Sequence, residues 1–224
     1  MSKETFIKDN LFAGDYPVET DVVTVLSGSD LVRGTILGKI TVGAVPTTGT
    51  ADVGNTGDGT LTVVTGGNET KVGVYTIKCV EAVTNGGIFQ VIDPDGIVLG
   101  QFIIAAGAGG TIAFTTAQIN GTITDGSTDF VLDDEFTVTV PAGSGKVVAV
   151  DSSNIDGSQN PYSILAEDTD ASAADVAAPA YLTGSYTEEV LVVGGSDSVA
   201  QHKAACRDLS IFIKNRVNKY QVYN

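Results

Sequence analysis

Apolar and polar residues alternate with a period of two along most of the chain, which is typical of strands that bury one face. In the run over residues 72–83, this alternation places Tyr75, Ile77 and Cys79 on the same face. Residues 85–87 and 93–96 are turn formers of the kind that close hairpins. Short strands are predicted in this central part at residues 61–65, 72–83, 87–92, 97–104, 111–115 and 135–140. Strands at this spacing favour a small β-sandwich or barrel.

Strands are also predicted on both sides of the central part. The stretch over residues 31–41 is apolar and contains two glycines, and it predicts a bent β-hairpin element with Ile36 on one face and Leu37 on the other. Gly34 and Gly38 suit a bend or a close backbone approach, because glycine takes positive φ without a steric penalty. Further strands are predicted at residues 22–25, 147–150, 162–166, 180–186 and 189–193, with an acidic, alanine-rich connection at residues 168–178.

The hydrophobic period changes near the end of the sequence. Apolar residues there recur at spacings of three, four or six, which predicts an amphipathic helix over residues 198–213. Asp197 or Ser198 is a suitable N-cap, and Lys214 complements the negative end of the helix dipole.

Two stretches of small and polar residues divide the chain into domains. Residues 46–60 are rich in Gly, Thr and Asp, and residues 141–145 read Pro-Ala-Gly-Ser-Gly. We therefore expect an inserted β-sandwich-like domain at residues 49–146. It interrupts a discontinuous domain that residues 21–48 and 147–224 form together.

Residues 1–20 alternate poorly and mix isolated aromatic side chains with charges. Such a segment is either a frayed terminus or an arm that a partner orders, and the residues alone leave both alternatives open. The segment is thus expected to be a third part of the chain, separate from both domains.

The chain is strongly acidic, with 12 Lys and Arg against 27 Asp and Glu in 224 residues and a formal net charge of -15. This balance argues against a nucleic-acid partner, because phosphate binding requires clustered basic side chains. The first ten residues lack the apolar core of a signal peptide, and no window is apolar enough for a membrane span, so neither secretion nor a membrane partner is expected. Cys79 and Cys206 are then expected as buried free thiols, with a disulfide between them as the alternative.

Residues that carry chemistry are few. His202 is the one histidine and is expected on the surface, and no Ser or Cys nucleophile can be assigned to it from spacing. Acidic clusters at residues 93–96, 125–129 and 133–134 contain calcium-ligand types, but none has EF-hand spacing and β-turns use the same residues. No zinc-ligand or dinucleotide-binding pattern is present. We therefore predict no catalytic, cofactor-binding or metal-binding residue and no enzymatic activity.

Three motifs in the outer parts of the chain resemble one known family. The motifs are Arg-Gly-Thr-Ile-Leu-Gly-Lys-Ile at residues 33–40, Asp-Gly-Ser-Gln-Asn-Pro-Tyr-Ser-Ile-Leu at 156–165 and Ala-Ala-Pro-Ala-Tyr-Leu-Thr-Gly at 177–184. In this order, with the predicted final helix, they resemble the lambda-like head decoration (capsid-stabilising) proteins of tailed bacteriophages. The resemblance implies a mainly β protein whose small β-barrel or β-tulip-like decoration domain has a C-terminal helix. A minimal member of that family lacks residues 49–146, which look like a β module seen inside several phage structural proteins.

The resemblance also implies a structural function on the phage head. Such proteins bind as homotrimers at three-fold and quasi-three-fold sites of the expanded capsid and stabilise it against the pressure of packaged DNA. The implied partners are the major capsid protein and further copies of the chain. The implied location is the outer surface of the virion capsid, after assembly in the host bacterial cytoplasm. The arm residues that would bind the capsid are Thr5, Phe6, Ile7, Leu11, Phe12 and Tyr16.

The alternative function belongs to a different class, a carbohydrate-binding or adhesive β-sandwich protein on a cell or virion surface. Residues 49–146 would then bind a host-surface glycan. The absence of Trp from the chain counts mildly against this alternative, because aromatic side chains commonly supply the flat face of a sugar site.

Overall fold

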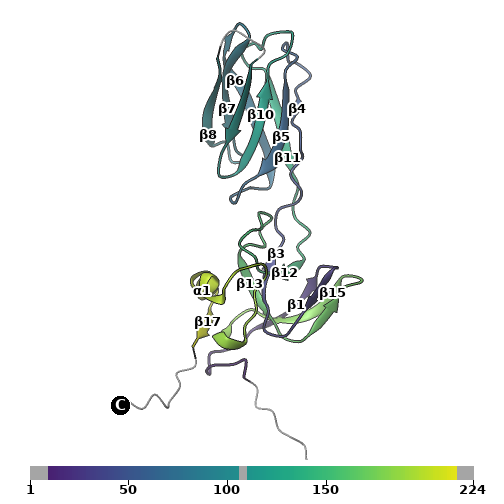
Figure 1. The fold of residues 1–224 in the computed structure, drawn as a ribbon, viewed down its shortest axis with the longest axis vertical. Helices are drawn as coiled ribbons and strands as arrows, with labels where there is room; N and C mark the ends of the chain where they lie inside the picture. Colours follow the sequence, from purple (N-terminus) through teal and green to yellow (C-terminus); the bar gives the residue numbers. More distant parts are fainter. Residues whose placement is uncertain (1–9, 106–109, 216–224) are drawn as a thin grey trace, which may run out of the picture. The chain divides into compact units, whose positions relative to one another are not determined.

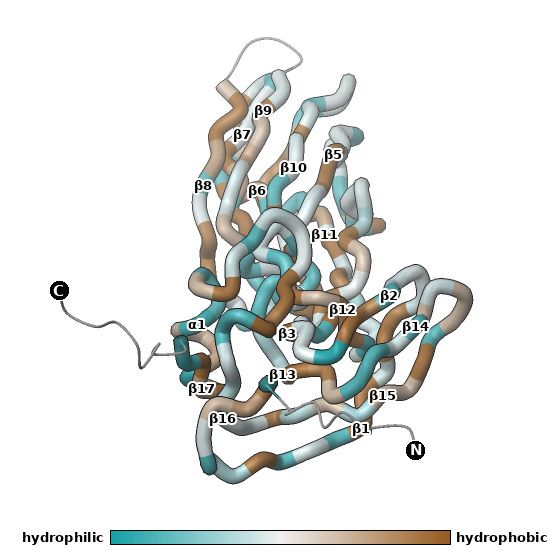
Figure 2. The backbone as a smooth tube through the Cα atoms, turned by 60° about the horizontal axis from the view of Figure 1, so that its bottom comes forward, coloured by the Kyte–Doolittle hydropathy of each residue, from teal (hydrophilic) through white to brown (hydrophobic). Residues whose placement is uncertain are grey.

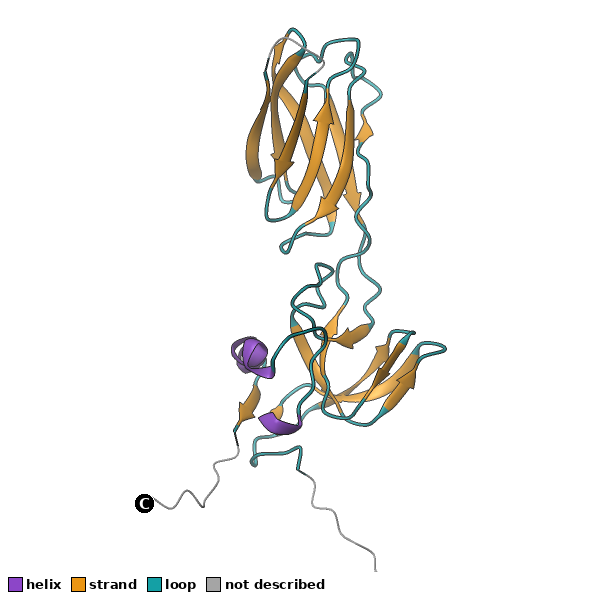
Figure 3. Cartoon of the chain, viewed as in Figure 1, coloured by secondary structure: helices purple, strands orange, loops and turns teal. Residues whose placement is uncertain are grey.

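The computed structural model describes residues 10–105 and 110–215 (Figure 1). The chain divides into two compact units. The first, here called the barrel unit, consists of Met1–Ile40 and Gly145–Asn224. The second, the sandwich unit, is Thr41–Ser144. Strands are the main regular secondary structure of both units, and the described residues contain one α-helix (Figure 3), so the prediction of a mainly β fold is confirmed.

Five strands of the barrel unit close into a barrel in the order β1-β12-β3-β13-β15. Their bounds are Thr20–Val25 for β1, Ile36–Lys39 for β3, Val147–Ala149 for β12, Pro161–Leu165 for β13 and Val176–Tyr181 for β15. Strand β1 runs parallel to β12, and the other neighbouring pairs in the barrel are antiparallel. Strands from the two outer parts of the chain are therefore neighbours in one barrel.

The remaining elements of the barrel unit lie outside the barrel. They are β2 (Ser29–Leu31), which pairs with β14 (Thr169–Ala171), the parallel pair β16 (Gly184–Thr187) and β17 (Ile211–Lys214), the 3-10 helix η1 (Glu188–Val190) and the helix α1 (Val199–Asp208). The pairing of β2 with β14 means that residues 31–41 do not form the predicted hairpin. Residues 168–178, predicted as a connection, contain β14 and the start of β15.

Strand β3 contributes to two cores at once. Ile36 and Leu37 are both fully buried, and they belong to different hydrophobic clusters on the two faces of the strand. Gly34 has φ +89°, so the predicted bend before β3 is confirmed. At Gly38 the backbone passes so close to Ser158 that an added Cβ would overlap the Ser158 carbonyl oxygen. Both glycines therefore have the roles that the sequence predicted for them.

The helix is shorter than predicted. Ser198 caps α1 with a capping box that includes Gln201, which confirms the predicted N-terminal end. The helix ends at Asp208, because Ser210 takes a left-handed conformation with φ +62° and turns the chain into β17. The prediction of a helix to residue 213 was wrong, and Lys214 lies at the end of a strand. The predicted strand at residues 189–193 was also wrong, since this stretch begins within η1.

The sandwich unit contains two antiparallel sheets. One has the order β5-β10-β9 and the other β4-β11-β6-β7-β8. The strand bounds are Thr50–Ala51 for β4, Thr60–Gly66 for β5, Gly73–Val83 for β6, Gly86–Ile92 for β7, Val98–Ile104 for β8, Thr111–Thr115 for β9, Ile119–Thr124 for β10 and Glu135–Val140 for β11. Side chains of both sheets form a single hydrophobic cluster, which includes the predicted face of Tyr75, Ile77 and Cys79. The alternation of hydrophobic and polar residues thus predicted this face correctly.

Strand β10 was not predicted, because its sequence is weakly apolar. Its inward positions are Ile119, Gly121 and Ile123, and the middle one has no side chain. A Cβ at Gly121 would come within 2.8 Å of the Phe114 ring, so Phe114 fills the space that a larger residue would need.

The chain leaves and re-enters the barrel unit at adjacent points. The Ile40 amide donates to the Lys146 carbonyl at 2.9 Å, and the Gly145 amide donates to the Ile40 carbonyl at 2.9 Å. The β3–β12 ladder therefore continues up to the residues at which the sandwich unit begins.

Gly38→Ala should destabilise the barrel unit by about 3 kcal/mol, because the new methyl group overlaps the backbone of Ser158 in the loop before β13, and β3 cannot move away without disturbing its pairing with β12 and β13. Gly28→Ala is the matched control. Gly28, unlike Gly38, has positive φ (+89°), but no atom lies within 4 Å of its Cβ position, so only about 1 kcal/mol of backbone strain is expected. Thermal unfolding of both variants measures the difference, and equal losses would contradict the close approach at Gly38.

Candidate functional site

The N-terminal segment at residues 10–16 is the candidate site, since it carries three of the six predicted binding residues. These three are Leu11, Phe12 and Tyr16. Thr5, Phe6 and Ile7 lie outside the described residues.

Residues 11–13 form an extra strand-like segment against β16. Phe12 makes an antiparallel bridge to Tyr186, the Ala13 amide donates to the Ser185 carbonyl at 2.8 Å, and the Thr187 amide donates to the Leu11 carbonyl at 2.8 Å. Strand β16 also pairs with β17 in parallel, and the two strands run side by side (Figure 2). The segment is therefore fixed to the barrel unit by main-chain hydrogen bonds as well as by its side chains.

Aromatic rings hold this segment in place. The ring of Phe12 lies 5.2 Å from that of Tyr181 and 5.5 Å from that of Tyr186, measured between centroids. The Tyr186 hydroxyl donates to the Thr183 carbonyl at 2.7 Å, and burial raises the pKa of Tyr186. A separate edge-to-face pair joins Tyr16 to Phe212 of β17, with 4.7 Å between centroids.

The three described residues differ in how much surface they leave for a partner. Leu11 is only 2% exposed and belongs to the same hydrophobic cluster as Ile36 and Cys206. Phe12 packs against that cluster, whereas Tyr16 is 41% exposed. In this structure Leu11 and Phe12 thus anchor the segment to its own domain. No local pattern indicates the partners of Phe12, because these contacts join residues about 170 positions apart.

His202 is buried, not exposed as predicted. It is 5% exposed, and its Nε2 lies 2.8 Å from Asp197 Oδ2. The backbone amide and hydroxyl of Ser152 also donate to the Asp197 carboxylate, and these hydrogen bonds with the one to His202 lower the pKa of Asp197. Because the Ser152 hydroxyl bonds the carboxylate and not the imidazole, the three residues connect α1 to the loop after β12 and do not form a nucleophilic triad.

The two cysteines are free and buried. Burial raises the pKa of both thiols, that of Cys206 to about 11. The thiols are therefore protonated near neutral pH and are poor nucleophiles and poor metal ligands. Buried free thiols were the predicted state, and the alternative disulfide is not formed.

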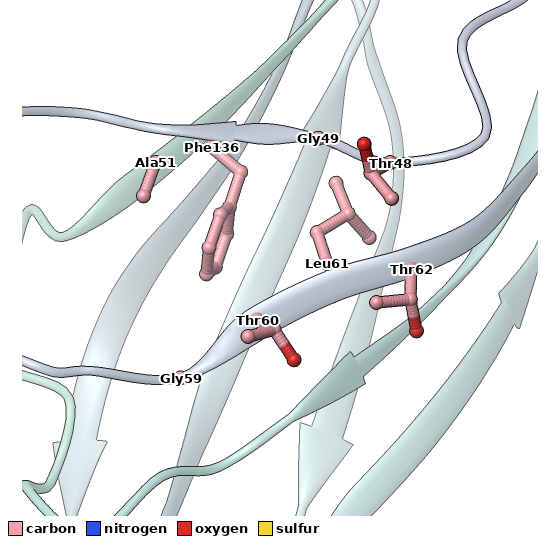
Figure 4. Close-up of a pocket in the computed structure, with 8 residues that line it drawn as sticks. All are labelled: Thr48, Gly49, Ala51, Gly59, Thr60, Leu61, Thr62 and Phe136. Atoms are coloured by element: carbon pink, nitrogen blue, oxygen red, sulfur yellow. The ribbon is translucent and has the colours of Figure 1, made fainter.

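A cavity of about 160 Å³ lies in the sandwich unit between β4 and β5, where Phe136 and Leu61 come between the two strands (Figure 4). Its lining residues are Thr48, Gly49, Ala51, Gly59, Thr60, Leu61, Thr62 and Phe136. None of them has an acidic, basic or imidazole side chain. In residues 10–105 and 110–215, no three His, Cys, Asp or Glu side chains are grouped to hold a metal ion. Within the same ranges, no helix has the length and apolar character that a membrane crossing requires.

A family model described as Bacteriophage lambda head decoration protein D matches residues 3–213 of the chain. The chain belongs to this family. The match covers nearly the whole sequence and confirms the resemblance seen in the motifs. The head decoration proteins are a structural family and not an enzyme class. Membership implies a capsid partner and a location on the phage head.

Other comparisons add little to this family assignment. No curated protein matches the chain. Two crystal structures of FlgL from Xanthomonas campestris are similar to 49% and 50% of the chain, with 18% and 20% identity and TM-scores of 0.32 and 0.31. The chain covers 33% of each FlgL chain, about a third of its length. At these TM-scores we infer neither fold nor function from FlgL.

In this decoration protein, the acidic cluster at residues 93–96 stabilises a turn between β7 and β8. The Lys71 ammonium lies 2.6 Å from both Asp93 and Asp95, and Asp93 accepts further hydrogen bonds from the Ile97 amide and the Gln118 side chain. These donors, Lys71 first, lower the pKa of Asp93 to about 2. The carboxylates of Asp93 and Asp95, which suggested calcium ligands in this cluster, are therefore already occupied by protein donors.

Asp125, in the acidic cluster at residues 125–129, is a buried carboxyl group. It is 6% exposed, and neither of its oxygens has a hydrogen-bond partner in the described part of the chain. Burial raises the pKa of Asp125, and the nearby charges of Asp129 and Asp58 raise it further. By contrast, Asp134 accepts from three backbone amides, those of Thr56, Gly57 and Val131. Burial of the unpartnered Asp125 carboxylate costs stability, whereas the three hydrogen bonds compensate for the burial of Asp134.

Leu11→Ala should lower the unfolding free energy of the barrel unit by about 2–5 kcal/mol, because it opens a cavity in a packed cluster. Tyr16→Ala, which removes one exposed ring contact, should cost about 1 kcal/mol. Thermal unfolding of the free protein measures both changes. An unchanged melting temperature for Leu11→Ala would show that the segment is not part of the folded core.

Asp93→Asn and Asp125→Asn should change stability in opposite directions at neutral pH. The pKa of Asp93 is lowered on folding, so its contribution to stability is present above its ordinary pKa near 4 and is lost as the pH falls through about 2. The pKa of Asp125 is raised on folding, so its ionisation costs stability once the pH rises above about 4. Melting curves from pH 3 to pH 7 should show Asp93→Asn less stable and Asp125→Asn more stable at pH 7. Both differences should shrink toward pH 3, and a destabilised Asp125→Asn at pH 7 would contradict an unpartnered carboxylate.

Proposed function

We propose that this chain binds as a homotrimer to the three-fold and quasi-three-fold sites of the expanded phage capsid and stabilises it against packaged-DNA pressure. Membership of the head decoration family supports the capsid as the partner. The observation that carries the mechanism is the anchoring of residues 11–13 to β16 by main-chain hydrogen bonds and aromatic contacts. Residues 1–9 precede this anchored segment in the chain and include Thr5, Phe6 and Ile7. They are the proposed capsid-binding arm.

An anchored arm reduces the entropic cost of binding. Because residues 11–13 are already fixed to the domain, binding to the capsid does not have to order them. An extended arm can add to a sheet of the capsid protein through main-chain hydrogen bonds, while Phe6 and Ile7 supply apolar contacts. A trimer presents three such arms to one site, so the effective concentration of the second and third arms is high. Exposed Tyr16, at the base of the arm, extends the contact onto the domain.

The charge of the chain fits the outer surface of the virion. A net charge of -15 gives no attraction to packaged DNA, so the chain gains nothing from the interior of the shell. The free thiols suit assembly in the reducing cytoplasm of a bacterial host. We propose this location and this place of assembly on these grounds.

We also propose that the sandwich unit is an inserted domain and is not needed for capsid binding. The chain departs after Ile40 and returns at Gly145, and the ladder between β3 and β12 is intact up to these residues. A two-residue Asn-Gly turn can therefore replace Thr41–Ser144 without changing the register of the barrel, since this turn closes antiparallel hairpins.

Binding to empty expanded shells of the phage capsid protein tests the proposed function. The full chain should sediment with expanded shells and not with unexpanded ones, and it should raise their melting temperature. A variant without residues 1–9 should lose at least about tenfold in affinity, because it lacks the arm. The variant with Asn-Gly in place of Thr41–Ser144 is the matched control and should bind like the full chain.

Full binding by the variant without residues 1–9 would contradict the arm mechanism. Failure of the full chain to bind either kind of shell would contradict the proposed function itself. Analytical ultracentrifugation of the shell-free protein and of protein released from shells tests the trimer.

Glycan binding by the sandwich unit is a separate and weaker proposal. The cavity beside Phe136 has a volume of about 160 Å³, well below the roughly 300–1,000 Å³ of most small-molecule sites. A sugar would therefore have to bind an exposed surface of the unit. A glycan array probed with the full chain tests this proposal, and the absence of any reproducible signal would contradict it.

A further inference from the structure

A long stretch of the sandwich unit carries no charged side chain. Residues 96–124 contain no Asp, Glu, Lys, Arg or His, although 17% of the residues in the whole chain are charged. Strands β8, β9 and β10 all lie in this stretch. Strand β10 is the middle strand of its sheet, whereas β8 and β9 are edge strands, one in each sheet. The uncharged part of the sequence therefore forms two sheet edges.

These two edges lie on the same side of the sandwich. The rings of Phe102 on β8 and Phe114 on β9 are 5.4 Å apart between centroids. At the opposite edge, where β4 lies (Figure 1), the chain itself joins the two sheets: the Gly49 amide donates to the Leu61 carbonyl of β5, and β4 then pairs with β11. In the part of the chain that the structure describes, no main-chain hydrogen bond reaches the outer edge of β8 or β9 from another segment. The sandwich is thus closed on one side and open on the other.

Strand β8 is an edge of the kind that proteins usually protect. Edge strands expose unpaired main-chain groups, and charged side chains, prolines or a very short length normally prevent another strand from adding to them. The opposite edge strand, β4, has only two residues. Strand β8 has seven residues without charge or proline, and it exposes Val98, Gln101 and Ile103. Its register with β7 is irregular only beside Val98, so Gly100–Ile104 form a regular edge that another strand can extend.

The charge of the chain favours a second copy of the chain as the source of the added strand. Two copies each carry a net charge of -15, and they repel one another wherever their carboxylates meet. An uncharged edge is the surface at which this repulsion is smallest. A basic partner would instead be attracted to the acidic surfaces elsewhere on the chain.

The residues of β8 are also compatible with pairing to themselves. Two copies of one strand that are related by a two-fold axis pair antiparallel. Every such register is free of like-charge pairs, because no residue of β8 is charged. The side-chain amide of Gln101 both donates and accepts hydrogen bonds, so two copies of this residue can bond to each other. Strand β8 therefore meets its own copy without an electrostatic or hydrogen-bonding conflict.

We propose that β8 pairs with β8 of a second copy of the chain, antiparallel and about a two-fold axis. The two five-stranded sheets then become one continuous sheet across the two copies. The main-chain groups at the outer edge of Gly100–Ile104 gain hydrogen-bond partners, and the exposed side chains of Val98 and Ile103 are partly covered. This pairing makes the sandwich unit a contact between copies, which goes beyond the proposed function and does not depend on it.

Analytical ultracentrifugation of the full chain, at concentrations up to roughly 1 mM, tests the pairing. The unchanged chain should form assemblies larger than the proposed trimer as its concentration rises. Gln101→Glu, which is nearly isosteric, should weaken this association at least about tenfold, because it brings two carboxylates into one small interface. Thr50→Glu is the matched control: it adds the same charge at an exposed position of β4, at the other edge of the same sheet, and should associate like the unchanged chain.

Two further measurements locate the contact. A mixture of Gln101→Glu and Gln101→Lys should associate more strongly than either variant alone, because opposite charges then meet across the two-fold axis. Hydrogen exchange of the unchanged chain should show slower exchange of amides in Gly100–Ile104 at high concentration than at low concentration, since paired amides are protected.

Several outcomes would overturn the pairing. They are the absence of assemblies larger than the trimer, equal weakening by Gln101→Glu and Thr50→Glu, and a mixture of charge variants that associates no better than either alone. Binding to expanded shells should be the same for Gln101→Glu as for the unchanged chain, and its loss would show that this edge meets the capsid protein instead. If the unchanged chain binds no shells but self-associates through β8, the proposed function is wrong while this inference stands.

Discussion

The barrel unit depends on the close backbone approach between Gly38 and Ser158. Gly38 is paired with Val148 of β12 on one side and Pro161 of β13 on the other, so the approach lies where β3 joins both of its neighbours in the closed barrel. Once β3 is fixed, Ile36 and Leu37 are directed into separate clusters, and the cluster of Ile36 also receives Leu11. The anchoring of the N-terminal segment is therefore a consequence of how the barrel closes. A side chain at residue 38 would disturb the core and the candidate site together.

Local patterns predicted the parts of the fold that local physics determines. The alternation through Tyr75, Ile77 and Cys79 identified a buried face, and glycines 34 and 38 were recognised from the backbone conformations that they permit. The helix was predicted too long because its apolar period continues past Asp208. The left-handed turn at Ser210 that stops it has no strong sequence signal. The predicted end of the helix was wrong because the backbone conformation of one residue, Ser210, outweighed the periodic pattern.

Contacts between distant residues could not be predicted in the same way. His202 appeared to be an isolated surface histidine, because nothing in the sequence indicates that it is buried against Asp197, whose carboxylate also accepts hydrogen bonds from the distant Ser152. Asp125 and Asp134 were indistinguishable as members of acidic turns, although one is unpartnered and the other accepts three amides. The pairing of residues 11–13 with β16, on which the proposed arm depends, likewise joins segments that are distant in the sequence.

The same pairing determines how the domain transmits force. Residues 11–13 lie along β16, and the chain continues from the Leu11 end. Tension applied through residue 10 along the strand acts on the Leu11 and Ala13 hydrogen bonds at the same time, in shear, and also on the ring of Phe12 against Tyr186. Bonds loaded in parallel share the load, whereas bonds peeled from one end fail one after another. A pull on this segment along the strand, such as the proposed arm would transmit, therefore meets a mechanically strong attachment.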